Sequence, residues 1–175
     1  MATLKYVEGD LFEYVDKCDT PIIIPHVCNN QGVWGAGFVV PLGKKYPLAK
    51  TIYLRNHLLG QLDLGSVDFI EVSDNIMVAN MIAQTLGGSR PLYYNDLAYC
   101  MDTIIGTKDD EFDKDTKGRF QKIVCPMFGS GLAGGDWNFI EKLIEDCWIR
   151  EGWDVTVCYF KSSLPKNWTL PIVYQ

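Results

Sequence analysis

The sequence predicts an α/β domain in which a mixed, mostly parallel central sheet is sandwiched between helices. Three observations predict this fold class. Apolar strand-like runs alternate with amphipathic runs, the order that builds layered α/β domains. Two of the apolar runs lead into glycine-rich loops, at 32–37 and 129–135, and a helical run follows each loop. Two further strand-like runs, 66–72 and 76–82, are joined by three turn residues and should pair antiparallel.

Two strands are expected before the first helix. Residues 4–11 alternate between apolar and polar side chains well enough for a strand. Residues 21–27 are mostly apolar and predict a central strand. Pro25 lies within this run, and because proline cannot donate a ladder hydrogen bond, the end of the strand should be irregular.

Prolines define the next helices. A helix should begin near Phe38, and Pro41 fits it only in the first turn, where its missing N–H has no helical partner anyway. Pro47 marks a break. A second helix over 48–59 should end at Gly60.

The C-terminal half should contain two helices and two strands. Pro91 should open a helix, and a strand at 123–127 should lead through the second glycine loop into a helix over 136–150. A last strand is expected at 153–159. The apolar positions with helical spacing are Leu97, Met101, Ile104 and Ile105 in the first helix, and Ile140, Leu143, Ile144 and Cys147 in the second.

We expect residues 1–175 to form a single domain, as the length suggests. Residues 106–119 carry many charges and almost no apolar side chain, which predicts a solvated loop insertion. The acidic spacing there matches no calcium loop. Residues 161–175 contain two prolines and predict an extended tail along the surface.

Composition restricts the class of protein. Hydrophobic residues make up 47% of the chain, enough for a full core, and no apolar run approaches the length of a membrane helix. The N-terminus lacks the form of a signal peptide. The formal charge of −6 argues against strong binding of duplex nucleic acid, whereas backbone dipoles could still bind a small phosphorylated ligand.

The six cysteines and two histidines predict neither disulfides nor a metal site. There is no secretion signal and no Cys-x-x-Cys pair. We therefore expect reduced thiols, a cytoplasmic location, no metal and no cofactor.

The two glycine loops predict an anion site. A glycine-rich loop between a strand and a helix lets backbone N–H groups surround an anion, so two such loops suggest a ligand with two phosphates. A tight turn alone could explain either loop. The first loop matches a dinucleotide fingerprint only in part, since its third glycine is missing, and the chain has no Walker A loop.

These segments together resemble the macro domain family. The resemblance runs through residues 6–12, 26–37, 44–47 and 126–137 and so covers most of the chain in order. Its closest branch contains ADP-ribose 1″-phosphate phosphatases and ADP-ribosyl-glutamate hydrolases. The resemblance implies a mixed six-stranded sheet between helices and binding of ADP-ribose or a derivative.

The resemblance also implies roles for individual residues. The carboxylate of Asp10 would accept a hydrogen bond from the adenine amino group, although a turn or helix-start role would explain it too. Asn29 and Asn30 would contact the distal ribose, and the two glycine loops would bind the phosphates. The implied ligand-binding residues are Gly9, Asp10, Leu11, Gly32, Trp34, Gly35, Ala36, Gly37, Gln84, Phe128, Gly129, Ser130, Gly131, Leu132, Ala133 and Gly134.

The chain departs from the glutamate-hydrolase branch at two positions. That branch has a catalytic lysine where this chain has Gln84, and an aspartate where this chain has Ala133. Glutamine cannot form a lysine-type adduct and alanine cannot act as a base, so this mechanism is disfavoured.

The remaining candidates for catalysis are His26, Asn29 and Asn30. The unperturbed pKa of histidine lies near neutrality, although His26 could equally be a hydrogen-bonded strand-end residue. Asp136 is better explained as a helix N-cap. Trp34 could cover the distal ribose or phosphate, or pack against Phe38 as a lid.

The leading hypothesis is an enzyme that hydrolyses the terminal phosphate of ADP-ribose 1″-phosphate. The alternatives are a non-catalytic ADP-ribose-binding module and a hydrolase that acts on ADP-ribosylated protein or nucleic acid. A binder of other nucleotides or RNA ends is a further possibility. We expect no membrane partner.

Overall fold

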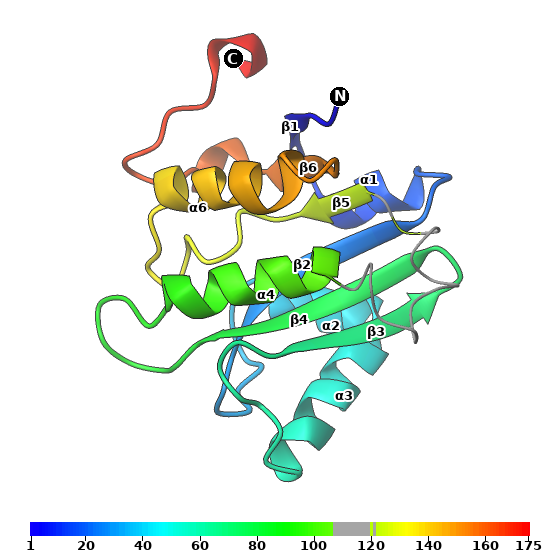
Figure 1. The fold of residues 1–175 in the computed structure, drawn as a ribbon, viewed down its shortest axis with the longest axis vertical. Coiled ribbons are helices and arrows are strands. Elements are labelled where there is room, and N and C mark those ends of the chain that lie inside the picture. The colour runs from blue at the N-terminus through cyan, green and yellow to red at the C-terminus, as the bar shows by residue number, and fades with distance from the viewer. Residues whose placement is uncertain (107–119, 121) are drawn as a thin grey trace.

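The chain forms one mixed six-stranded sheet (Figure 1). The computed structural model describes residues 1–106, 120 and 122–175. The strand order is β1-β6-β5-β2-β4-β3, and every neighbouring pair is parallel except β3 and β4. The strands are β1 Leu4–Glu8, β2 Ile22–Asn29, β3 Val67–Ser73, β4 Ile76–Gln84, β5 Lys122–Cys125 and β6 Asp154–Tyr159. The predicted mixed, mostly parallel sheet is confirmed.

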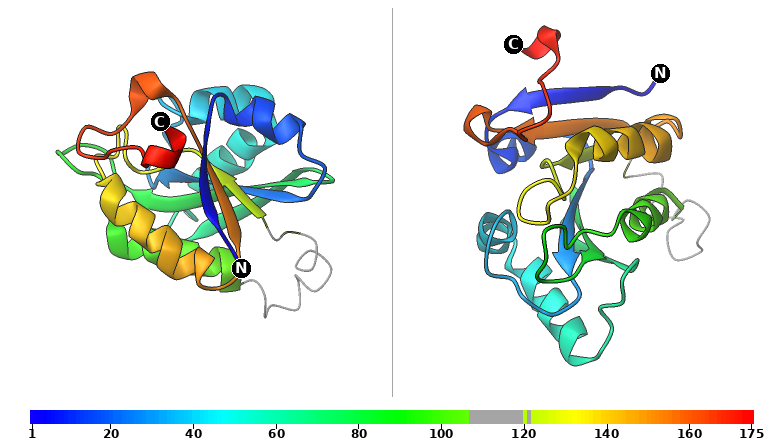
Figure 2. Two further views of the ribbon diagram at one scale, coloured as in Figure 1. Left: turned by 90° about the horizontal axis from the view of Figure 1, so that it is seen from above. Right: turned by 90° about the vertical axis from the view of Figure 1, so that its left-hand side faces the viewer.

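Helices cover both faces of this sheet, which gives the predicted three layers (Figure 2). One face carries α1, α2 and α3, whose Val15, Leu42 and Tyr53 belong to one apolar cluster. The other face carries α4 and α6, whose Leu97 and Ile140 belong to a second cluster. The helices are α1 Leu11–Asp16, α2 Val39–Lys45, α3 Pro47–Leu58, α4 Tyr94–Gly106 and α6 Trp137–Ile144, the last extended by a π-helical turn over Glu145–Ile149.

The prolines lie where their missing N–H groups are tolerated. Pro41 is in the first turn of α2, as predicted, whereas Pro47, which was expected to be a break before a helix over 48–59, is the first residue of α3. Pro25 lies inside β2, but β2 pairs with β5 through Ile22 and Ile23 alone, before the proline. The irregularity expected at the end of β2 is a register shift between Cys28 and Asn29.

Two element boundaries differ from the prediction by three residues. The first strand ends at Glu8 because Gly9 has a φ of 124° and Asp10 caps α1, a short helix that the alternation of residues 4–11 had concealed. Helix α4 begins three residues after Pro91, because Leu92 forms an isolated β-bridge with Gln84.

The C-terminal segment packs against the first strand. The Tyr6 ring lies 5.1 Å from the Trp168 ring and 5.6 Å from the Tyr174 ring, measured between centroids. The Tyr6 hydroxyl donates to Glu141 and accepts from Trp137 Nε1. Two short 3₁₀ turns, Lys161–Ser163 and Ile172–Tyr174, lie in this segment.

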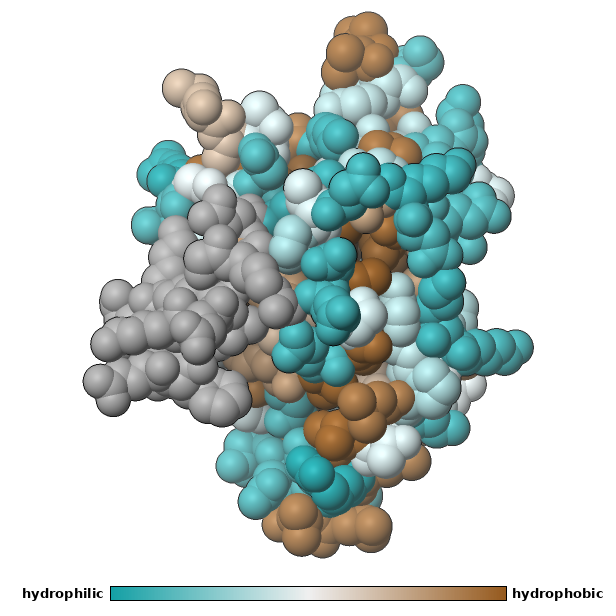
Figure 3. All heavy atoms as spheres, turned by 90° about the vertical axis from the view of Figure 1, so that its right-hand side faces the viewer, coloured by the Kyte–Doolittle hydropathy of each residue, from teal (hydrophilic) through white to brown (hydrophobic). Residues whose placement is uncertain are grey.

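The surface at the edge where α4 ends and β5 begins is mainly hydrophilic, with smaller hydrophobic patches (Figure 3). Among the helices in the described part of the chain, none has the length and apolar character needed to span a bilayer. The charged insertion expected at 106–119 lies outside the described residues from position 107 onward.

Candidate functional site

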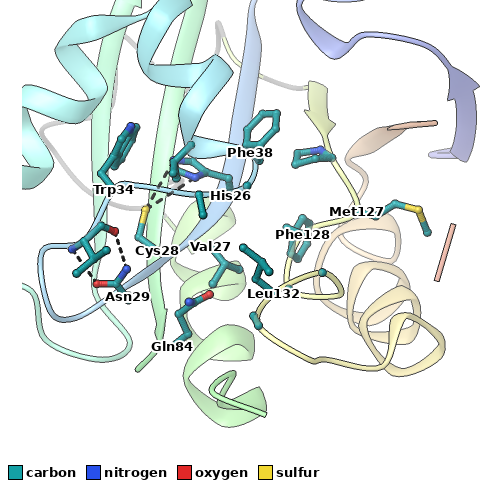
Figure 4. Close-up of a pocket in the computed structure, with 18 residues that line it drawn as sticks. His26, Val27, Cys28, Asn29, Trp34, Phe38, Gln84, Met127, Phe128 and Leu132 are labelled. Atoms are coloured by element: carbon teal, nitrogen blue, oxygen red, sulfur yellow. Dashed lines mark hydrogen bonds between the residues drawn. The ribbon is translucent and has the colours of Figure 1, made fainter. Parts of the chain in front are cut away.

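A pocket of about 270 Å³ opens between the carboxyl ends of β2 and β5 (Figure 4). After β2 the chain continues to α2 and α3 on one face of the sheet, and after β5 it continues to α6 on the other. Neighbouring strands whose connections leave in opposite directions separate at their carboxyl ends, and ligands of open α/β sheets bind in the crevice that results. The fold thus places both glycine loops around one cavity.

The first loop is held in shape by Asn29. Its Oδ1 accepts hydrogen bonds from the backbone N–H groups of Gln31 and Val33, at 3.0 and 3.2 Å, and from the Tyr53 hydroxyl at 2.8 Å. Its Nδ2 donates to the carbonyl of Val33 over 2.7 Å. These bonds occupy the Asn29 amide, so its side chain positions the loop instead of facing a ligand freely.

The Trp34 side chain of the same loop packs against two other aromatic rings, those of His26 and Tyr53. Trp34 is 9% exposed and its ring centroid lies 5.3 Å from that of Tyr53 and 5.6 Å from that of His26. Its indole Nε1 is buried and faces Gly43 of α2, where an added Cβ would lie 2.8 Å away. Trp34 is therefore a packed wall of the pocket, and its indole leaves no room for a side chain at position 43.

His26 is buried in the centre of the sheet. It is 1% exposed, and its Nε2 donates to Oδ1 of Asn80 over 2.5 Å. Burial penalises the charged imidazolium and lowers the pKa of His26 to about 4. The imidazole is therefore neutral at pH 7, and this placement argues against a role as proton donor.

The second loop contains glycines that the fold requires. Gly129 and Gly134 have φ values of 76° and 71°, a region that favours glycine. A Cβ on Gly134 would lie 2.6 Å from the carbonyl oxygen of Ser89, and a Cβ on Gly135 would lie 2.5 Å from that of Gly129. These glycines are explained by the backbone alone.

Gly131 is different. It lines the pocket, its φ lies outside the left-handed region, and an added Cβ would meet no atom of the described residues within 4 Å. The neighbouring Leu132 is 75% exposed and reaches across the mouth to the first loop, where its Cδ1 would lie 3.6 Å from a Cβ on Gly37. The two loops therefore face each other across the cavity.

The pocket brings together many of the predicted residues, but not all of them. Those that line it are His26, Asn29, Trp34, Ala36, Gly37, Gln84, Phe128, Gly129, Gly131, Leu132 and Ala133. Those outside its lining are Gly9, Asp10, Leu11, Asn30, Gly32, Gly35, Ser130 and Gly134. Ser130 and Gly134 line a larger groove of about 680 Å³ on the other side of the second loop, and the Ser130 hydroxyl donates to the carbonyl of Met127 over 2.7 Å.

Asp10 lies at the carboxyl end of β1, one strand beyond β6. Its Oδ1 caps α1 by accepting from the N–H of Phe12 over 3.0 Å. The strand ends are joined because the N–H of Gly9 donates to the carbonyl of Tyr159 over 2.9 Å. The next residue, Phe160, is 55% exposed. Phe160 was not among the site residues predicted from the sequence, although an aromatic residue directly after a predicted strand could have marked it as a candidate.

A third glycine loop, between β4 and α4, was also missed. Gly87 and Gly88 have φ values of 86° and 81°, and Ser89 contacts the second loop at Gly134. The run Gly-Gly-Ser before Arg90 was visible in the sequence. Asp136, as predicted, is an N-cap, and its Oδ1 accepts from the N–H of Asn138 over 2.9 Å.

Comparison with known proteins agrees with this geometry. No family model matches the sequence. The chain is 32% identical over 150 residues to an ADP-ribose 1″-phosphate phosphatase of Candida albicans, covering 82% of this chain and 92% of that protein. A macrodomain protein from Streptomyces coelicolor superposes with a TM-score of 0.72 at 30% identity, covering 89% of this chain and 98% of that one. A Bacteroides thetaiotaomicron protein of unknown function superposes with a TM-score of 0.79 at 28% identity, covering 91% and 99%.

The fold and its pocket define a layered α/β domain with paired glycine loops at the ends of parallel strands. The chain belongs to the macro domain family.

Proposed function

We propose that the protein binds ADP-ribose and hydrolyses the terminal phosphate of ADP-ribose 1″-phosphate. Relatives with the corresponding phosphatase name match over most of their length, 92% for the Candida albicans protein and 91% for that of Lodderomyces elongisporus. The geometry supports the same ligand, because two backbone loops face one small cavity without a charged side chain among its described lining residues.

Gly131 carries the proposal. Its φ lies outside the left-handed region that favours glycine and the described residues leave room for a side chain, so neither feature of the fold explains the glycine. A bound diphosphate would explain it, because a bare backbone allows close approach of an anion to N–H groups. Any loop with this backbone shape would need glycine at positions 129 and 134, whereas the glycine at position 131 is available for contact with the ligand.

The pocket is too small for the whole ligand, and the strand order suggests how the rest lies. We place the distal ribose and the phosphates over β2 and β5. The adenosine would extend over β6 and β1, toward Asp10 and Phe160. The free carboxylate oxygen of Asp10 would accept from the adenine amino group, and the exposed Phe160 ring would stack on the base.

In the hydrolysis, water would attack phosphorus, the bond from phosphorus to the 1″ oxygen would break, and ADP-ribose and inorganic phosphate would leave. Loop N–H groups would stabilise the charge that develops on phosphate oxygens. His26 would support the loop through Trp34 and Phe38, whose ring centroids lie 5.6 and 5.8 Å from the imidazole. A direct acid–base role for His26 remains a prediction that its burial disfavours.

One observation favours a second candidate, the non-catalytic binding module. Two of the three residues predicted for catalysis are engaged elsewhere: Asn29 holds the loop, and His26 is buried and neutral. Such a module could also recognise ADP-ribosylated macromolecules. A cytoplasmic location would suit either function, since all six cysteines are unpaired.

The test is a pair of measurements on the wild-type protein. Calorimetric titration with ADP-ribose should show affinity in the micromolar class, and ADP competing equally well would point to a general nucleotide binder. Release of inorganic phosphate from ADP-ribose 1″-phosphate should then be measurable. Binding without release would establish the binding module, and absence of ADP-ribose binding would refute both candidates.

A further inference from the structure

Gln84 differs from the other polar side chains of the pocket because it is only half-buried and its amide makes no hydrogen bond to the described residues. Five described lining residues carry a side-chain hydrogen-bond donor: His26, Cys28, Asn29, Trp34 and Gln84. The Asn29 amide is occupied by the loop, and the Trp34 Nε1 is buried against Gly43. Elimination among these side chains leads to Gln84.

His26 and Cys28 line the pocket, but their polar atoms contact protein groups and are shielded from solvent. His26 donates to Asn80, and the Cys28 Sγ lies 3.8 Å from both ring nitrogens of His26. Both side chains are almost completely buried, with exposures of 1% and 3%. Burial also raises the pKa of the Cys28 thiol, which keeps it protonated and uncharged.

Gln84 is placed to meet the far end of a ligand. It is the last residue of β4, half-buried, and its backbone carbonyl accepts from the N–H of Asn30 over 3.0 Å. This bond fixes the strand end beside the first loop without using the side chain. Figure 4 shows the amide directed into the pocket toward Val27 and Leu132. The glutamine lies over β4, on the opposite side of β2 from the phosphate position over β5.

From this placement we propose that Gln84 is the specificity-determining residue that recognises the group attached at the 1″ position of the distal ribose. The proposal rests on the proposed function. The amide Nε2 donates to an oxygen of an anionic 1″ substituent, and the amide adds no charge of its own to the pocket. Plain ADP-ribose presents a hydroxyl there and gains less from this contact, because hydrogen bonds to charged groups are the stronger ones.

The experiment compares two ligands in four proteins: wild type, Gln84→Met, Gln84→Glu and Gln84→Lys. The methionine variant keeps an unbranched chain without the amide, the glutamate variant keeps the shape and adds a repelling charge, and the lysine variant adds an attracting charge. For each protein, the KM for ADP-ribose 1″-phosphate and the Kd for ADP-ribose are measured. If wild type binds the 1″-phosphate without hydrolysing it, a calorimetric Kd replaces the KM.

We expect Gln84→Met to raise the KM for the 1″-phosphate at least about tenfold, the loss typical of one hydrogen bond to a charged group. Gln84→Glu should raise it further, and Gln84→Lys should leave it equal to or below the wild-type value. The Kd for ADP-ribose should change less than about threefold in Gln84→Met. Exposed Gln61, changed to glutamate and to lysine, provides controls with the same net charge and should leave both constants unchanged.

Three outcomes overturn the proposal in distinguishable ways. If wild type binds both ligands and Gln84→Met weakens both equally, or neither, then Gln84 does not recognise the 1″ group while the proposed function stands. If wild type binds neither ligand, the proposed function fails and this assignment fails with it. A KM that follows the charge at Gln61 as strongly as at Gln84 would also contradict the proposal, since net charge alone would then explain it.

Discussion

Substitution of the glycines in the second loop should separate the requirements of the fold from those of the ligand. Gly131→Ala and Gly131→Glu introduce side chains into open space with an unstrained φ. Gly134→Ala introduces a Cβ 2.6 Å from the Ser89 carbonyl oxygen at a φ of 71°. The loop therefore offers a matched pair of positions, three residues apart.

The structure allows the size of each effect to be worked out. The left-handed conformation costs a residue with a Cβ roughly 1–2 kcal/mol, and the overlap in Gly134→Ala adds to it. For a domain of this size, each kcal/mol lowers Tm by roughly 2–4 °C, so Gly134→Ala should melt several degrees below wild type. Gly131→Ala and Gly131→Glu should melt within about 2 °C of wild type, because ordinary surface substitutions change stability by about 0.5 kcal/mol.

Ligand binding should follow the opposite pattern. The carboxylate of Gly131→Glu would occupy the space of the diphosphate and repel it, at a cost of roughly 1–4 kcal/mol for each pair of charges about 4 Å apart. Calorimetry with ADP-ribose should therefore detect little or no binding by Gly131→Glu, and weakened binding by Gly131→Ala. The exposed Gln61→Glu variant adds the same charge elsewhere and should bind normally.

Two results would refute this reasoning. A folded Gly131→Glu protein with wild-type affinity would place the phosphates away from the second loop. A Gly131→Ala protein that unfolds as readily as Gly134→Ala would mean that the fold itself requires this glycine, and the main support for the ligand position would be lost.

Three further predictions test the wall and the far end of the site. The pKa of His26 is about 4 in the folded protein against an ordinary value of 6.5, so the unfolded chain binds a proton first as pH falls. The protein should therefore lose about 3 kcal/mol of stability between pH 6.5 and pH 4. Chemical denaturation should show a weaker dependence of unfolding free energy on pH in His26→Gln, and an identical dependence in both proteins would contradict the buried neutral state. Gly43→Ala should lower Tm despite its better helix propensity, because the methyl group would lie 2.8 Å from Trp34 Nε1. Gly106→Ala, whose methyl group would lie more than 4 Å from every described atom outside its own helix, should not. Equal melting temperatures would show that Trp34 can move aside. Asp10→Asn retains an oxygen for the helix cap, so it should weaken ADP-ribose binding about tenfold while Tm stays close to the wild-type value. Unchanged affinity in calorimetry would disprove the adenine contact.

Local sequence patterns were sufficient to predict the layers and most of the elements. The apolar runs, the prolines at 41 and 47 and the glycine loops predict structure through interactions within a few residues of each other. The antiparallel pairing of β3 and β4 was predictable for the same reason, because a short connection, two residues long in the structure, leaves few alternatives. Asp136 was also correctly predicted as a cap, since the capping hydrogen bond lies within one helical turn.

The roles of polar residues required the tertiary structure. His26, Asn29 and Gln84 are all plausible site residues in the sequence, and nothing local separates them. Contacts with distant parts of the chain decide the matter: Asn80 lies 54 positions from His26, and Tyr53 lies 24 positions from Asn29. Burial and hydrogen bonding to these partners neutralise His26 and occupy Asn29, whereas Gln84 has its amide directed into the pocket.

The sequence by itself therefore determined the kind of fold and the loops that surround the ligand, because hydrophobic periodicity and glycine geometry act over short distances. The tertiary structure decided which glycine is free for a phosphate and which polar side chain is free for the substrate. Both depend on the space and hydrogen-bond partners that remain once the sheet has brought distant segments together.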